Sequence, residues 1–132
     1  MTQRCVLLLR AVNLGARNKV PMARLRELIA EKTALANVST YIASGNVLCE
    51  MPSDRAAARD EVRRLIAAEF DVDTPVISRT HEELVASLAA QPFTDAVENL
   101  LHAMFLADAP VAGAIEALTP RLVPGEAIAL VG

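Results

Sequence analysis

CVLLLRAVNLGARNKVPMARLRELIAEK, residues Cys5 to Lys32, runs from an apolar segment through a polar loop into an amphipathic pattern. The nearly continuous apolar run from Cys5 to Val12 favours a strand that is buried on both faces. Pro21 suits the first position of a helix, and the apolar residues after it recur at spacings of three and four. The stretch therefore predicts a strand, a loop, and a helix from Pro21 to Glu31 or Lys32.

A hairpin is predicted next, in VSTYIASGNVLCE, residues Val38 to Glu50. Two short β-prone runs, Val38–Ala43 and Val47–Glu50, flank Ser44-Gly45-Asn46, and a Gly-Asn pair accepts the positive φ of a tight turn. A helix capped by Ser53 and ending at Phe70 follows, and then a strand at Thr74–Ser78. The order β-α-β-β-α-β is the ferredoxin-like arrangement, here without the cysteines of an iron–sulfur site.

The rest of the chain is predicted to form a partial second unit of similar type, in the order α-β-α-β. Its expected elements are a helix at Thr80–Ala90, a strand at Leu100–Leu106, a helix from Pro110 or Val111 to Leu118, and a strand at Ala127–Val131. The fold class is therefore α+β, with a ferredoxin-like unit over residues 1–79 and a partial one over residues 80–132. We expect the two units to pack as one globular body.

Composition bounds the class of protein. With 132 residues, 53% of them hydrophobic and 22% charged, the chain has enough apolar material for a folded core. No apolar run is long enough for a membrane span and no signal peptide is evident, which predicts a cytoplasmic protein. Cys5 and Cys49 have neither the number nor the spacing of a disulfide framework or zinc site, so we expect buried, reduced thiols. No metal or cofactor is predicted.

Positive charge is concentrated near the N-terminus. Residues 1–32 hold seven basic and two acidic side chains, a net charge of +5, whereas residues 33–132 hold six and fourteen, a net charge of −8. A pI near 5.4 argues against binding to duplex DNA, which needs many phosphate contacts, but leaves room for one focused anion site. We interpret Arg24, Arg26 and Lys32 as the solvated face of the first helix.

The candidate ligand-binding site lies where the first strand, the next helix and the hairpin turn meet. In the ferredoxin-like arrangement the first two strands are parallel, which brings these segments to one end of the sheet. Arginine offers a planar fork to an anion, lysine a mobile charge, and the helix N-terminus free amides. The candidate residues are Arg10, Asn13, Arg17, Asn18, Lys19, Ser44, Gly45 and Asn46. The alternative is that the Asn and Gly residues only form turns and that Arg10 pairs with a carboxylate.

Other groups point to no chemistry. His81 and His102 are lone histidines, for which capping or exposure is the favoured interpretation. Ser44 has no base nearby in the sequence, so no catalytic residue is assigned. The glycine-rich motifs of nucleotide-binding loops are absent, and 3% aromatic residues leave no base-stacking platform for RNA.

The stretches Leu8–Leu28 and Tyr41–Val47, together with TPVISRTHEELVASLAAQPF and LHAMFLADAP, resemble the bacterial family called domain of unknown function 1697. The resemblance runs from about Val6 to the C-terminus. The family usually reads R-G-[IV]-N-V-G-G, then N-K, and later Y-I-Q-S-G-N-V. The positions that keep the pattern are Arg10, Asn13, Gly15, Asn18, Lys19, Tyr41, Ser44, Gly45 and Asn46; those that depart from it are Ala11, Ala16 and Ala43. The resemblance implies two ferredoxin-like units and supplies no substrate. Members usually continue past Gly132 with a Trp-containing segment, so we expect a truncated or short member.

Three hypotheses follow. The favoured one is a small binding or regulatory module for an anionic metabolite or nucleotide. The second is an enzyme completed by a missing C-terminal segment. The third is a homo-oligomeric structural or interaction protein.

Overall fold

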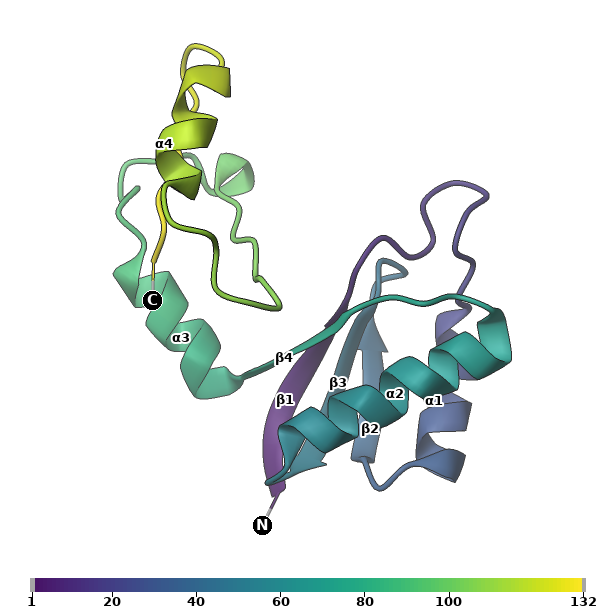
Figure 1. The fold of residues 1–132 in the computed structure, drawn as a ribbon. Helices are drawn as coiled ribbons and strands as arrows, with labels where there is room; N and C mark the ends of the chain where they lie inside the picture. Colours follow the sequence, from purple (N-terminus) through teal and green to yellow (C-terminus); the bar gives the residue numbers. More distant parts are fainter. Residues whose placement is uncertain (1, 132) are drawn as a thin grey trace. The chain divides into compact units, whose positions relative to one another are not determined.

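A four-stranded sheet with two helices forms the first part of the molecule (Figure 1). The computed structural model describes residues 2–131, and the chain divides into two units, Met1–His81 and Glu82–Gly132. The elements of the first unit are β1 (Thr2–Leu9), α1 (Met22–Lys32), β2 (Ala36–Tyr41), β3 (Asn46–Pro52), α2 (Arg55–Phe70) and β4 (Val76–Thr80). The α+β class is confirmed, and the first unit has the predicted element order β-α-β-β-α-β.

The strands lie in the order β2-β3-β1-β4, and each neighbouring pair is antiparallel. Because β1 and β2 both run antiparallel to β3, they are parallel to each other, as predicted. The register places Cys5 opposite Cys49 and Leu7 opposite Val47. The C-terminal end of β1 therefore lies beside the turn between β2 and β3.

One face of this sheet is buried. Alternate residues of the inner strands point into a single core, which Leu25 and Ile29 of α1 and Val62 and Ile66 of α2 complete. Both helices thus cover the same face. The prediction that β1 is buried on both faces is wrong, because Val6 and its same-face neighbours stay partly exposed.

The ends of the elements follow their backbone chemistry. β1 ends at Leu9 rather than Val12, because Ala11 has a φ of 56° and breaks the extended run. Pro21 is the residue before α1 rather than its first residue. The cap of α2 is Asp54, whose carboxylate accepts a hydrogen bond from the N–H of Ala57 at 3.1 Å, so the prediction of Ser53 is wrong.

The second unit contains helices and turns. Its elements are α3 (His81–Ala90), η1 (Glu98–Leu100), α4 (Ala114–Leu118) and η2 (Thr119–Arg121). The strands predicted at Leu100–Leu106 and Ala127–Val131 are wrong, since the described residues of this unit form no strand. A strand is defined by a ladder of backbone hydrogen bonds to a neighbouring strand, and the described residues of these two segments are not part of such a ladder.

The helix predicted from Pro110 or Val111 begins later, at Ala114. Gly113 precedes it with a φ of 81°, a left-handed conformation that a helix interior does not admit. None of the described residues of the second unit is buried. The core of the chain therefore lies in the first unit.

Candidate functional site

Asn13 holds the loop after β1 against the β2–β3 turn. Its side-chain N–H groups donate to the carbonyls of Val20 at 2.8 Å and Ala43 at 2.7 Å, and its Oδ1 accepts from the N–H of Val20 at 2.8 Å. Its own backbone N–H donates to the carbonyl of Asn18 at 2.9 Å. The amide is thus fully occupied by the protein, and its role is to position the two segments.

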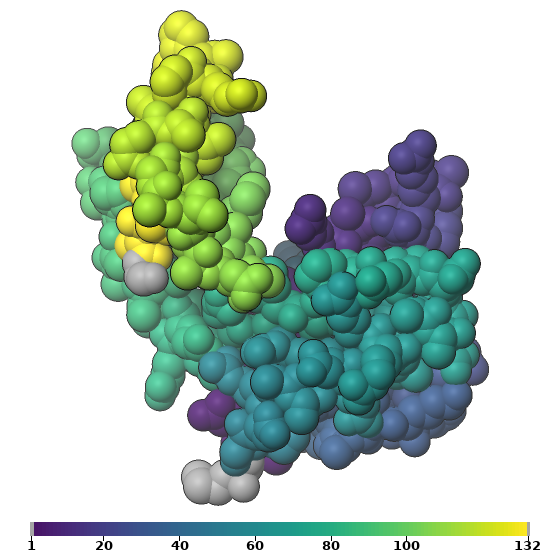
Figure 2. Space-filling view, viewed as in Figure 1, coloured from purple at the N-terminus to yellow at the C-terminus, as the bar shows by residue number. Residues whose placement is uncertain are grey.

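The loop between these contacts closes on itself. Asn18 adopts a φ of 50° and donates from Nδ2 to the carbonyl of Ala11 at 2.9 Å. The N–H of Arg17 donates to the carbonyl of Leu14 at 3.1 Å, around Gly15. Residues 14–19 are exposed, and the surface of this loop is visible in purple to indigo in Figure 2.

Gly45 brings the turn into direct contact with the end of β1. Its carbonyl accepts the N–H of Leu9 at 2.9 Å, and its φ is +96°. A Cβ added there would lie 2.7 Å from Cγ2 of Val12 and 2.9 Å from Cβ of Leu9. Nearby, Asn46 donates from Nδ2 to the carbonyl of Tyr41 and to Ser44 Oγ, both at 3.2 Å. These contacts fix the backbone conformation of the turn and its position against β1.

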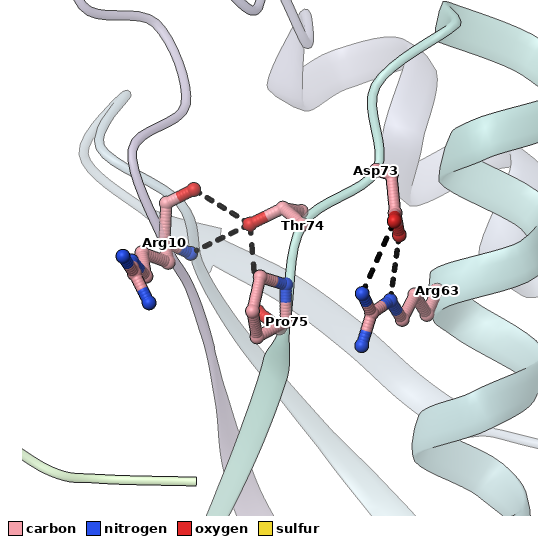
Figure 3. Close-up of polar contacts among 5 residues, drawn as sticks. All are labelled: Arg10, Arg63, Asp73, Thr74 and Pro75. Carbon is pink, nitrogen blue, oxygen red and sulfur yellow. Dashed lines mark hydrogen bonds and ion pairs between the residues drawn. The ribbon is translucent and has the colours of Figure 1, made fainter.

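Arg10 fixes the other side of this sheet end through its backbone. Its N–H donates to Thr74 Oγ1 at 3.1 Å, and Thr74 Oγ1 donates to the carbonyl of Arg10 at 2.6 Å (Figure 3). In the same view Arg63 makes a two-pronged ion pair with Asp73, at 2.6 and 3.1 Å. The hydrogen bond from Arg63 lowers the pKa of Asp73 below its ordinary value. The alternative interpretation, in which Arg10 pairs with a carboxylate, finds no such ion pair among residues 2–131.

An open groove of about 590 Å³ lies beside the Asn13 contact. It combines two cations and two polar side chains with an apolar part that comes from the start of α1 and the β2–β3 turn. The lining residues are Asn13, Lys19, Pro21, Met22, Arg26, Thr40, Ile42 and Ala43. The volume falls in the range of small-ligand sites.

The charge of this groove is positive. Arg26 is half-buried and donates from its guanidinium to Thr40 Oγ1 at 2.5 Å, so its interpretation as a solvated side chain is wrong. Within the described residues, neither Lys19 nor Arg26 has a carboxylate partner. Residues 10–26 contain five basic and no acidic side chains, and residues 33–49 contain no charged side chain at all. An anion entering the groove would therefore meet uncompensated positive charge.

Two of the eight predicted residues, Asn13 and Lys19, line the groove. The remaining six are not among its lining residues: Arg10, Arg17, Asn18, Ser44, Gly45 and Asn46. Their assignment to ligand binding stays a prediction. What the structure gives them instead is a set of hydrogen bonds that shape the loop and the turn.

Six of the eight lining residues were not among the predicted site residues, namely Pro21, Met22, Arg26, Thr40, Ile42 and Ala43. A signal for Arg26 was present, because it follows Met22 by four residues and therefore shares its helix face. This helix face adjoins the expected ligand site, so Arg26 could have been predicted as a site residue. Thr40 and Ile42 lie on either side of Tyr41, within the hairpin whose turn was already a candidate.

Metal and membrane chemistry find no support in the described part of the chain. Residues 2–131 contain no cluster of three or more His, Cys, Asp or Glu side chains that could hold a metal ion. Within the same residues, no helix has the length and apolar character needed to cross a membrane.

Comparison with known proteins settles the family. The family described as "Protein of unknown function (DUF1697)" matches residues 1–132. The chain belongs to this family. A comparison with curated proteins finds no match.

One similar solved structure is that of the conserved bacterial protein SP0830 from Streptococcus pneumoniae. It shares 28% sequence identity with this DUF1697 chain at a TM-score of 0.62, over 70% of this chain and 51% of that one. The chain therefore spans about half the length of this structural neighbour. The similarity supports the fold, and the neighbour's description names no ligand.

Proposed function

We propose that this DUF1697 chain is a small binding module for an anionic metabolite or nucleotide, which it holds in the groove of Lys19 and Arg26. The observation that carries the proposal is the presence of two cations in one groove without a carboxylate partner among the described residues. Their spare N–H donors point to an anion as the partner. The Asn13 contacts support the proposal, because they hold the loop of Lys19 and the turn of Ile42 in place before a ligand arrives.

A screen of phosphorylated and carboxylated metabolites by thermal shift, followed by calorimetric titration of the hits, tests this proposal. We expect Lys19→Ala and Arg26→Gln each to weaken binding at least about tenfold, because each removes one charge from the groove. Glutamine keeps a donor for Thr40, so the second variant tests charge rather than the hydrogen bond.

Arg24→Ala is the matched control. Arg24 lies on the same helix, is exposed and pairs with Glu27 at 3.1 Å, so its loss removes the same charge outside the groove. Its affinity should stay within about twofold of the native value. Equal losses in all three variants would show general attraction to a basic surface and would contradict a defined site.

A second candidate function, self-association, is favoured by one observation in the second unit. Large apolar side chains there are exposed, including Leu88 at 68%, Leu100 at 71% and Met104 at 86%. Exposed apolar patches of this kind mark interaction surfaces. Sedimentation velocity over a range of protein concentrations tests this candidate function.

A further inference from the structure

The groove offers more than charge. Besides Lys19 and Arg26, its lining includes the apolar side chains of Pro21, Met22 and Ile42. A free inorganic anion would use the cations alone and leave this apolar surface in water. A ligand with an anionic head and an apolar body would use both parts.

Ile42 is the strongest sign of an apolar subsite. It is 61% exposed and adopts a φ of 53°, a left-handed conformation that is rare for a β-branched residue. The hairpin thus holds a large apolar side chain in solvent at a cost in backbone energy. Strained residues of this kind cluster where a ligand is bound.

Met22 adds a side chain suited to a flat ring. It is partly buried against the core and also lines the groove. A thioether packs favourably against the edge or face of an aromatic ring and adapts to its shape. Pro21, which comes just before it, contributes a rigid apolar surface.

The polar groups define the anionic head. The side-chain amide of Asn13 is already committed to Val20 and Ala43, and Thr40 Oγ1 already accepts from Arg26. The donors left for a ligand are the ammonium of Lys19 and the remaining guanidinium N–H groups of Arg26. Two positive charges match the two negative charges of a phosphate monoester near neutral pH.

We infer that the groove binds an aromatic phosphate monoester, with the phosphate on Lys19 and Arg26 and the ring on Met22 and Ile42. This inference rests on the proposed anion-binding function and narrows its ligand class. A nucleoside monophosphate also combines these two parts, because its phosphate is joined through ribose to an aromatic base. The apolar lining supplies the preference for an ester over the free phosphate ion.

Titration of the intact chain with inorganic phosphate, phenyl phosphate and phenol, followed by calorimetry or by chemical shifts, tests the inference. Phenyl phosphate should bind at least about tenfold more tightly than inorganic phosphate. Ile42→Ala and Met22→Ala should reduce this ratio to about two. Lys19→Ala should weaken both anions.

Leu14→Ala is the matched control, because Leu14 is 63% exposed, similar to Ile42, but lies outside the groove. It should leave the ratio unchanged. Equal binding of phosphate and phenyl phosphate would overturn the inference and leave the proposed anion site standing. If neither anion binds while another anion from the metabolite screen does, the phosphate class is wrong; if no anion binds at all, the proposed function fails as well. Binding of phenol alone would show an apolar site without an anionic head and would contradict both.

Discussion

Asn13 and Gly45 shape the candidate site through their contacts with neighbouring segments of the chain. The side-chain amide of Asn13 forms hydrogen bonds with Val20 and Ala43. The carbonyl of Gly45 accepts a hydrogen bond from the N–H of Leu9, and its Cα lies close to Val12. Both residues therefore shape the end of the sheet. Lys19 and Arg26 are the charged residues of the groove, and neither has a carboxylate partner among the described residues.

The first prediction concerns Gly45→Ala. The new Cβ would overlap Val12 and Leu9, and an L-residue at a φ of +96° is strained as well. We expect a loss of about 3 kcal/mol in the free energy of unfolding, from overpacking and backbone strain together. Urea unfolding followed by circular dichroism measures it.

Gly15→Ala serves as the control for strain without overlap. Gly15 has a φ of +59°, but a Cβ there meets no atom within 4 Å. Its cost should be about 1 kcal/mol. If the two variants lose the same stability, the contact of the turn with Val12 and Leu9 is not what requires glycine.

At this scale the sequence predicted positions better than roles. The polar loop and the Gly-Asn turn do meet, as inferred from the parallel relation of the first two strands. Asn13 was predicted as a ligand residue; it lines the groove and its side chain also bonds to Val20 and Ala43, so its assignment to ligand binding stays a prediction. Arg26 was missed because a charged helix residue is usually solvated, and its contact with Thr40 depends on how α1 packs over β2.

The elements of the first unit were predictable because each has a strong local signal. Apolar runs, three- and four-residue spacing and turn residues place every strand and helix within a few residues of its position. Their ends were less predictable, since a left-handed residue such as Ala11 or a cap such as Asp54 depends on contacts beyond its neighbours.

Strands β1 and β3 place two thiols opposite each other in the core. Cys5 and Cys49 are register partners, are both free and are almost fully buried. Burial, followed by the neighbouring Cys5, raises the pKa of the Cys49 thiol from 9.0 to about 11, against a smaller lowering by Arg4. The predicted buried, free thiols are confirmed.

The second prediction follows from this pKa. Between pH 9 and pH 11 the unfolded chain loses the Cys49 proton while the folded chain keeps it, so the unfolded state is favoured. The contribution is fully present below pH 9 and is lost as the pH rises to about 11, by up to about 3 kcal/mol.

Cys49→Val isolates this contribution, because it keeps an apolar side chain of similar size on the strand. All other titratable groups are the same in the two proteins, so the difference between their stability profiles isolates the thiol. We expect urea unfolding from pH 8 to 11 to show a steeper loss for the native chain. Parallel profiles would mean that the thiol is open to solvent.

At the scale of the molecule, the two units differ in how they are stabilised. Every buried residue described lies between Cys5 and Ser78, whereas residues 82–131 expose their large apolar side chains. The strands predicted in the second unit do not form. Local β-propensity at Leu100–Leu106 is real, but pairing depends on a neighbour that the local sequence does not specify.

The last prediction is that a second copy of the chain covers this apolar surface. Residues 82–131 hold seven acidic and one basic side chain, a net charge of −6, so two copies repel one another at low salt. Sedimentation velocity should therefore show a monomer in dilute, low-salt solution. The fraction of dimer should grow as the salt concentration rises about tenfold and the protein concentration about hundredfold.

Hydrogen exchange on the same samples locates the contact. Amides of β1 and β3 should exchange equally slowly under all conditions, because the core of the first unit protects them, whereas amides near Leu88, Leu100 and Met104 should slow only as the dimer forms. Leu88→Asp should prevent both the dimer and the added protection, and Leu14→Asp, an equally exposed site in the first unit, should prevent neither. A monomer at every condition, with fast exchange throughout residues 82–131, would rule out self-association as the way in which this surface is covered.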